Sequence, residues 1–203
     1  MCQYLRSLPY KNHDFQAMSI LKNYIENLKE QLDLLPIDVI ESWGNNFLQL
    51  WKNNKQLFIC GNGGSAGNAI HLANDYLYGI SPCKPPAMRV TALTANPSIL
   101  TCLGNDVGYD AIFSEQLKTL GQCGDLLLVF SGSGNSPNVL QALQKAKDLE
   151  MQAIALNGEG GGKLATVADI LIAVPPRSTP RIQELQLPIL KGTQTLIWGR
   201  ACR

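Results

Sequence analysis

The sequence predicts an α/β fold in which a five-stranded parallel sheet carries helices on both faces and follows two N-terminal helices. Three observations support this prediction. Five short apolar runs alternate with helical patterns, two of these runs end in glycine- and serine-rich loops, and the first 54 residues show helical periodicity. Alternating strands and helices build a parallel sheet with right-handed crossovers. With 203 residues, 45% of them hydrophobic, the chain can bury the core of a single domain over 1–203.

Residues 1–54 are predicted to form two amphipathic helices. The first begins near Asp14, and the second begins at Pro36, where the missing N–H of a proline costs nothing. The apolar positions of the two helices are Met18, Leu21, Ile25, Leu28 and Leu32, then Ile40, Trp43, Phe47 and Trp51. A narrow stripe is typical of helix–helix packing, so we expect 1–54 to serve oligomer packing. For the second helix, packing on the chain's own sheet is an equally good interpretation.

Residues 55–203 are predicted to hold the α/β core and a C-terminal helix. The predicted strands are 56–60, 88–93, 125–130, 152–156 and 169–174, and the helical patterns between them lie at about 65–78, 109–121, 136–150 and 163–168. Pro188 and Gly192 interrupt the last helical pattern, where an interior proline costs about 3 kcal/mol. A shorter helix that begins at Pro188 is therefore an alternative.

Two loops follow predicted strands at the sheet edge where ligands of parallel sheets bind. Their glycines allow a close approach of the backbone, and the N–H groups of the next helix point at whatever binds there. Serine hydroxyls can hold a phosphate without a cluster of arginines. We therefore predict a sugar-phosphate site, although either loop alone could be a tight turn. Its residues are Asn62, Gly63, Gly64 and Ser65 from the first loop and Ser131, Gly132, Ser133 and Ser136 from the second.

Several classes of function are disfavoured. Neither loop carries the third glycine of a dinucleotide fingerprint or the GK[ST] of a P-loop, so we expect no nucleotide cofactor. The formal net charge is +1 without a basic stripe, which argues against binding to nucleic acid or to a membrane. The apolar runs are too short to span a bilayer and the N-terminus lacks a signal-peptide core, so we expect a cytoplasmic protein.

Four motifs in order give the chain a family resemblance. They are Cys60–Ser65, Cys102–Asp106, Ser131–Ser136 and Arg181–Glu184, within a likeness that runs from about Phe15 to Gln183. The chain resembles the sugar isomerase (SIS) domain family and, within it, the sedoheptulose 7-phosphate isomerases, also called phosphoheptose isomerases. The resemblance implies a three-layer, flavodoxin-like fold and a homotetramer built through the N-terminal helices. It also implies conversion of sedoheptulose 7-phosphate to D-glycero-D-manno-heptose 7-phosphate, a heptose precursor of lipopolysaccharide and other surface glycans.

The resemblance also implies roles for individual residues. Ser131, Ser133 and Ser136 would hold the phosphate, and Asn62 and Ser65 would contact the sugar. Hydroxyls of the open-chain substrate would be bound by Asn105 and Asp106, which could otherwise form a turn with a helix cap. Many family members bind zinc through a His and a Glu one helical turn apart and a Gln and a His of the C-terminal helix. Those positions hold His71, Asp75, Gln183 and Lys191 here.

Two of these positions depart from the family pattern. Asp75 is one methylene shorter than the family's Glu, and Lys191 replaces the family's His. Protonated lysine has no lone pair and cannot bind zinc, so zinc would rest on His71, Asp75 and Gln183, with Asp75 and Lys191 as catalytic candidates. His71 could instead be a core histidine. The alternative function is a non-catalytic sugar-phosphate-binding tetramer, like the family members that bind the bacterial replication initiator.

Overall fold

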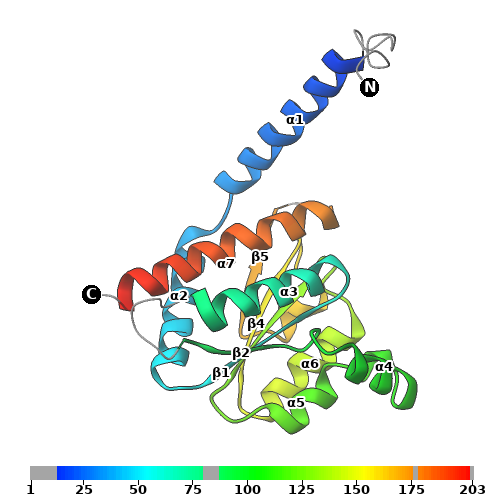
Figure 1. Cartoon of the computed structure of the whole chain (residues 1–203), viewed down its shortest axis with the longest axis vertical. Helices are drawn as coiled ribbons and strands as arrows, with labels where there is room; N and C mark the ends of the chain where they lie inside the picture. Colours follow the sequence, from blue (N-terminus) through cyan, green and yellow to red (C-terminus); the bar gives the residue numbers. More distant parts are fainter. Residues whose placement is uncertain (1–12, 80–86, 176–177, 202–203) are drawn as a thin grey trace, which may run out of the picture. The chain divides into compact units, whose positions relative to one another are not determined.

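The predicted α/β architecture is confirmed by the computed structural model, which describes residues 13–79, 87–175 and 178–201 (Figure 1). Five parallel strands form one sheet in the order β2-β1-β3-β4-β5. The strands are β1 (Gln56–Gly61), β2 (Arg89–Ala92), β3 (Leu126–Ser131), β4 (Gln152–Asn157) and β5 (Ile170–Ala173). Their ends differ from the predicted ends by at most one residue.

Helices cover both faces of this sheet. The α-helices are α1 (His13–Asp33), α2 (Ile37–Lys52), α3 (Gly64–Asn74), α4 (Pro97–Asp106), α5 (Ser114–Leu120), α6 (Pro137–Asp148) and α7 (Thr179–Ala201). Short helical turns are η2 (Asp75–Gly79), η3 (Tyr109–Ala111) and η4 (Gly162–Thr166). Helices α5 and α6 pack together on one face, and α3 and α7 lie side by side on the other (Figure 1).

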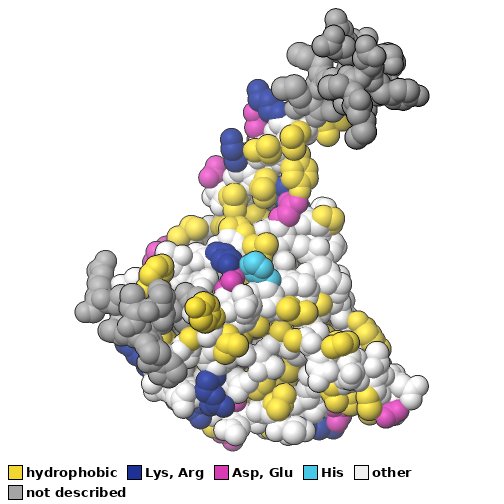
Figure 2. Space-filling view, viewed as in Figure 1, with side chains coloured by type: hydrophobic (Ala, Val, Ile, Leu, Met, Phe, Trp, Pro, Cys, Tyr) yellow, Lys and Arg dark blue, Asp and Glu magenta, His cyan; other side chains and the backbone are white. Residues whose placement is uncertain are grey.

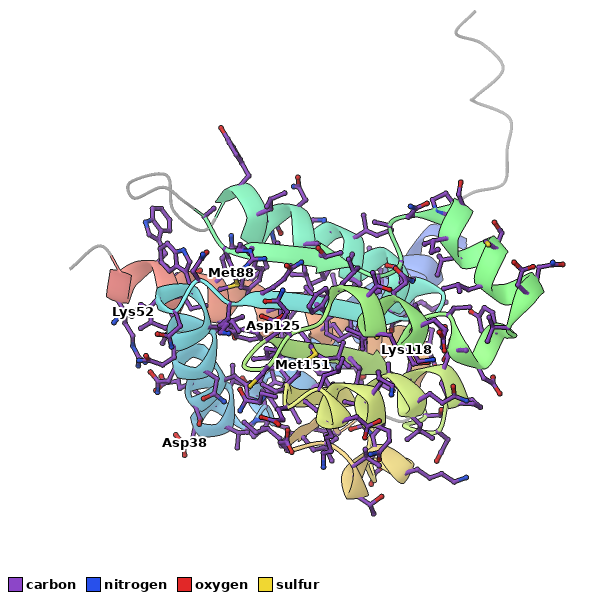
Figure 3. All side chains as sticks on the ribbon, turned by 90° about the horizontal axis from the view of Figure 1, so that it is seen from below. Asp38, Lys52, Met88, Lys118, Asp125 and Met151 are labelled. Carbon is purple, nitrogen blue, oxygen red and sulfur yellow. The ribbon has the colours of Figure 1, made fainter. Side chains whose placement is uncertain are left out.

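The strands are apolar because the sheet is buried on both faces, as parallel sheets are. All six residues of β3 and five of the six residues of β1 are buried. Side chains fill the space between the sheet and its helices, among them the buried Met88 and Met151 (Figure 3). The buried carboxylate of Asp125 accepts hydrogen bonds from the backbone N–H groups of Gln56 and Gln122, both at 2.9 Å. This carboxylate thereby ties together the starts of β1 and β3.

The first two helices differ in their packing. Helix α1 belongs to a unit of its own, Met1–Leu35, and exposes Leu21 and Ile25. Helix α2 belongs to the second unit, Pro36–Arg203, and packs along α7. Its Trp43 and Phe47 are fully buried and make an edge-to-face contact at 6.3 Å. The interpretation that the second helix covers the chain's own core is therefore confirmed.

Helix α7 is continuous through Pro188, so the alternative of a shorter helix that begins there is wrong. Proline removes the bond from its own nitrogen to the carbonyl four residues earlier, which is that of Glu184. Pro188 itself is exposed, while Leu185 and Ile189 on either side of it are buried. Burial of this apolar side offsets the lost hydrogen bond.

Among the described helices, none has the length and apolar character needed to cross a bilayer.

Replacing Phe47 by alanine tests whether α2 belongs to the core. We expect Phe47→Ala to lower the free energy of unfolding by about 3–5 kcal/mol, because it empties a fully buried site. The control is Ile37→Ala, at a position of α2 that is 55% exposed, which should change stability by no more than about 0.5 kcal/mol. Urea unfolding followed by circular dichroism measures both, and two equally small effects would contradict the packing of α2.

Candidate active site

A cavity of about 200 Å³ lies at the carboxyl ends of β1 and β3, where the two loops were predicted to bind a ligand. The described residues that line it are Asn62, Ser65, Phe130, Ser131, Gly132, Ser133, Ser136, Thr179 and Gln183. Most of the predicted sugar-phosphate residues therefore meet in one place, although the two loops are about seventy residues apart in the sequence.

The amino ends of three helices meet at this cavity. Helix α3 begins at Gly64, α6 begins directly after Ser136, and α7 begins at Thr179. The amino end of a helix carries a partial positive charge, which favours the binding of a phosphate. The described lining residues include no arginine or lysine. Helix ends and hydroxyl groups are thus the groups available here for an anion.

The second loop arranges its hydroxyls through its own backbone. Ser131 Oγ accepts a hydrogen bond from Gly134 N at 3.1 Å, and Ser133 Oγ accepts one from Asn135 N at 3.2 Å. Gly134 has φ +67, and a side chain there would collide with the carbonyl of Gly161. Ser136 precedes α6 but its side chain makes no capping hydrogen bond. Its hydroxyl is therefore available to a ligand, which favours phosphate contact over capping.

Thr179 is a lining residue that the sequence analysis missed. A methyl group at position 132 would lie 3.2 Å from Thr179 Oγ1, so Gly132 leaves the space that this threonine side chain takes up. A third hydroxyl-bearing segment thereby reaches the phosphate loop from the start of α7. In the sequence, only the nearby Arg181–Glu184 motif indicates that the start of α7 lies at the cavity.

Asn62 is held by residues far away in the sequence. Its amide exchanges two hydrogen bonds with the buried amide of Asn138, both of 2.9 Å, and the hydroxyl of Tyr109 donates to Asn62 Oδ1 at 3.0 Å. The reciprocal amide pair fixes which atoms Asn62 presents to the cavity. Asn138 and Tyr109 carry no sequence signal of this role, because the contacts span 76 and 47 residues.

Helices α3 and α7 are joined by side-chain amides. Asn68 Nδ2 donates to the Gln183 carbonyl at 2.9 Å and to Gln186 Oε1 at 2.8 Å. Gln186 Nε2 in turn donates to the buried Ser65 Oγ at 3.1 Å. The side chain of Gln183 packs directly on Gly64, where any side chain would displace it. The amide of Gln183 therefore lies at the loop end of the site.

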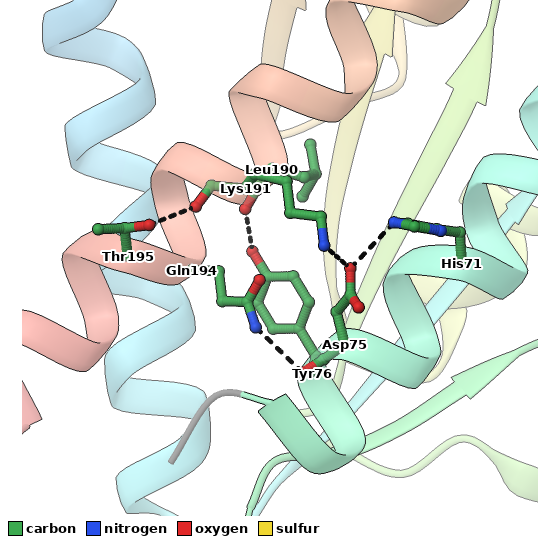
Figure 4. Close-up of polar contacts among 7 residues, drawn as sticks. All are labelled: His71, Asp75, Tyr76, Leu190, Lys191, Gln194 and Thr195. Atoms are coloured by element: carbon green, nitrogen blue, oxygen red, sulfur yellow. Dashed lines mark hydrogen bonds and ion pairs between the residues drawn. The ribbon is translucent and has the colours of Figure 1, made fainter. Parts of the chain in front are cut away.

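A charged cluster lies farther along the same two helices (Figure 4). The ammonium of Lys191 donates to Asp75 Oδ2, and the same oxygen lies 3.2 Å from His71 Nε2. The Asp75 side chain is 17% exposed, against 53% for His71 and 44% for Lys191. His71 is thus no core residue, and that interpretation is wrong. A histidine beside an acidic and a basic side chain is visible on the molecular surface (Figure 2).

The backbone around this cluster is fixed by hydrogen bonds. Asp75 is the first residue of the π-helical turn η2, and its carbonyl accepts from Gln194 Nε2 at 3.1 Å. The Tyr76 hydroxyl donates to the Leu190 carbonyl at 2.8 Å. Burial raises the pKa of Tyr76, and the negative charge of Asp75 adds to the effect, so this hydroxyl stays protonated and keeps its bond to α7.

The phosphate-loop cavity and the charged cluster are well separated along α3. Six residues separate Ser65 from His71 and ten separate it from Asp75, so the rise of a helix places them roughly 9 Å and 15 Å apart along its axis. Contacts of Asn68 with Gln183 and of Asp75 with Lys191 show that α7 runs parallel to α3. A ligand that reaches both places must be extended.

The predicted zinc ligands do not come together as a zinc site. His71 and Asp75 are adjacent, but the amide of Gln183 lies against Gly64, seven residues ahead of His71. The described part of the chain holds no group of three or more His, Cys, Asp or Glu side chains suited to a metal. Asp75 Oδ2 is already bonded to the ammonium of Lys191. This donor set does not fit zinc, which requires lone pairs from three or four ligands.

Asn105 and Asp106 lie outside the cavity. They are exposed at the end of α4, where Asn105 Nδ2 donates to Asp106 Oδ1 at 2.7 Å and the thiol of Cys102 donates to Asp106 Oδ2 at 3.4 Å. The bond from Asn105, followed by that from Cys102, lowers the pKa of the Asp106 carboxyl. Neither residue is among those that line the cavity, so their contact with substrate stays a prediction.

Comparisons with known proteins agree with this geometry. The family model for the SIS domain matches residues 21–158. The phosphoheptose isomerase of Akkermansia muciniphila is 44% identical over 138 residues, which cover 68% of this chain and 72% of that protein. The phosphoheptose isomerase of Sulfurimonas denitrificans is 39% identical over 178 residues, which cover 83% and 91%.

Solved structures give the same result. The phosphoheptose isomerase from Neisseria gonorrhoeae superposes with a TM-score of 0.80 at 34% identity, over 91% of this chain and 97% of that one. The phosphoheptose isomerase from Francisella tularensis gives a TM-score of 0.82 at 32% identity, over 89% and 97%. The region matched by the SIS family model, residues 21–158, includes both cavity loops and the segment that bears His71 and Asp75. The chain therefore belongs to the SIS domain family, in its phosphoheptose isomerase branch.

Proposed function

We propose that this protein is a cytoplasmic phosphoheptose isomerase. It converts sedoheptulose 7-phosphate to D-glycero-D-manno-heptose 7-phosphate, which supplies heptose for lipopolysaccharide or other surface glycans. The observation that carries the proposal is a cavity of about 200 Å³ at the amino ends of three helices. Two of these helices, α3 and α7, lead to the cluster of His71, Asp75 and Lys191. Relatives that bear the name phosphoheptose isomerase support this assignment.

The phosphate and the reacting carbons occupy opposite ends of the site in this proposal. Ser131, Ser133 and Ser136 bind the phosphate together with the N–H groups of the helix ends, and Thr179 adds a hydroxyl. Asn62 and Ser65 bind sugar hydroxyls. The separation of roughly 9–15 Å along α3 suits an open-chain sugar phosphate of several carbons and is too long for a triose phosphate.

The chemistry moves one carbon-bound proton and one hydroxyl proton. The carboxylate of Asp75 removes a proton from C1 of the ketose, and the electron pair of that C–H bond forms a C1–C2 double bond. The carbonyl electrons then move onto O2, where the N–H groups of Lys191 stabilise the negative charge. Asp75 returns its proton to C2 while the hydroxyl proton of O1 ends on O2, which leaves the aldose.

We further propose that the enzyme is a homotetramer assembled through α1. Leu21 and Ile25 are 59% and 44% exposed on this helix. Apolar side chains spaced along one helix face are suited to packing against a helix of another subunit. In this arrangement α1 alone supplies the assembly helix, because α2 packs on the core of its own chain.

The phosphate role is tested by the double variant Ser133→Ala, Ser136→Ala. We expect affinity for sedoheptulose 7-phosphate to fall by about 2–3 kcal/mol, since each hydroxyl donates to a charged group. Calorimetry measures the affinity, and Ser98→Ala, an exposed serine on α4, is the control that should bind normally. Unchanged affinity in the double variant would refute the proposed phosphate loop.

The catalytic role of Asp75 is tested by Asp75→Asn. We expect turnover to fall by at least about 100-fold because the amide cannot accept the C1 proton, while sugar-phosphate affinity is preserved. A coupled assay with sedoheptulose 7-phosphate measures turnover, and Asp38→Asn on the surface of α2 is the matched control. If the native protein binds sugar phosphates yet converts no ketose phosphate, the enzyme proposal fails and a non-catalytic binding protein remains.

The assembly role of α1 is tested by Leu21→Lys with Ile25→Lys. Both side chains are exposed within the chain, so the charges should leave folding intact and dissociate the tetramer by burying unpaired charge at the interface. Light scattering measures the mass, with Lys22→Ala as the control. A monomeric native protein, or a double variant that stays tetrameric, would contradict the proposal.

A further inference from the structure

The ammonium of Lys191 occupies a position that the family resemblance gives to a metal-binding histidine. It bonds to Asp75 Oδ2, the same oxygen that lies 3.2 Å from His71 Nε2 (Figure 4). A metal ion held between His71 and Asp75 would have to take the place of this nitrogen. Lysine cannot act as a ligand in exchange, because its ammonium group has no lone pair and repels cations.

The position of Lys191 is fixed by its surroundings. Its carbonyl accepts a hydrogen bond from Thr195 Oγ1 at 2.9 Å, and the preceding carbonyl of Leu190 accepts one from the buried Tyr76 at 2.8 Å. Gln194 Nε2, one turn of α7 later, donates to the Asp75 carbonyl. Hydrogen bonds thus join the segment that carries Asp75 to the helix that carries Lys191. These bonds hold the two side chains of the ion pair close together.

The charges in the cluster also argue against an added cation. Asp75 is mostly buried, and the ammonium of Lys191 compensates its charge. In the described chain, no further His, Cys, Asp or Glu side chain joins His71 and Asp75 to form a metal-binding group. A divalent ion would find one carboxylate that is already paired and one imidazole. The negative charge of Asp75 is therefore already balanced by Lys191 without a metal ion.

We propose that Lys191 replaces the divalent metal in this chain, so that its ammonium supplies the positive charge at the reacting oxygens and the protein binds no metal at this site. The inference rests on the proposed isomerase function for the role of the charge. The claim about metal binding is independent of it, because metal content and affinity can be measured without turnover.

Metal binding decides the inference directly. Native protein purified without chelators should contain far less than one zinc per chain by elemental analysis and should show no Co²⁺ absorption bands on titration. Lys191→His supplies an imidazole beside His71 and Asp75, and we expect it to bind Zn²⁺ at least about 100-fold more tightly than the native chain. Lys191→Gln, which removes the charge without adding an imidazole, is the matched control and should gain much less.

The outcomes separate cleanly. Stoichiometric metal in the native protein that is lost in His71→Ala would overturn the inference, and so would a folded Lys191→His variant that gains no affinity. If that variant fails to fold, the metal content of the native chain still decides.

Turnover provides a second test. In the active enzyme, turnover should survive chelators, and Lys191→Met should lower turnover by at least about 100-fold with sugar-phosphate affinity unchanged. Loss of activity on chelation, restored by zinc, would refute the proposal, whereas absence of any turnover would refute only the isomerase function.

Discussion

The packing of α3 against α7 positions the cavity and the charged cluster relative to each other. These helices are more than a hundred residues apart in the sequence, yet side chains of α3 and of the turn η2 that follows it are hydrogen-bonded to α7. Asn68, Ser65 and Gln186 join them near the cavity, Tyr76 meets the Leu190 carbonyl in the middle of α7, and Asp75 meets Lys191 close by. Because the helices run parallel, both present their amino ends to the same cavity. The loop end and the charged cluster therefore keep a fixed spacing.

The two ends of the site use different electrostatics. At the cavity, the described groups are neutral hydroxyls, amides and helix ends, which stabilise an anion without introducing a full positive charge. At the other end, formal charges are concentrated on a half-buried ion pair beside an exposed imidazole. This division suits a substrate with a permanent charge at one end and a charge that develops only during the reaction at the other.

The sheet and the phosphate loop could be predicted because their signals are local. Buried strands such as Leu126–Ser131 are continuous apolar runs, and glycine and serine mark the turn that follows. The contacts of Thr179, Asn138 and Tyr109 could not be predicted, since they depend on where distant segments meet in the folded chain. Burial of the α2 side chains was likewise undecided, because an apolar stripe does not reveal its partner. The pairing of Asp75 with Lys191, 116 residues apart, was suggested only through the family resemblance.

The proline within α7 has a mechanical consequence. Pro188 lies between Thr179, which reaches the phosphate loop, and Lys191, which reaches Asp75. It removes one rung of the hydrogen-bond ladder on the exposed side of the helix, and sharp helix bends occur at such positions. The backbone hydrogen bonding of α7 is thus interrupted between the two segments that serve the two ends of the site. A bend at Pro188 would change the spacing between Thr179 at the cavity and Lys191 at the charged cluster, so the bonds between α3 and α7 on either side of it are what hold that spacing.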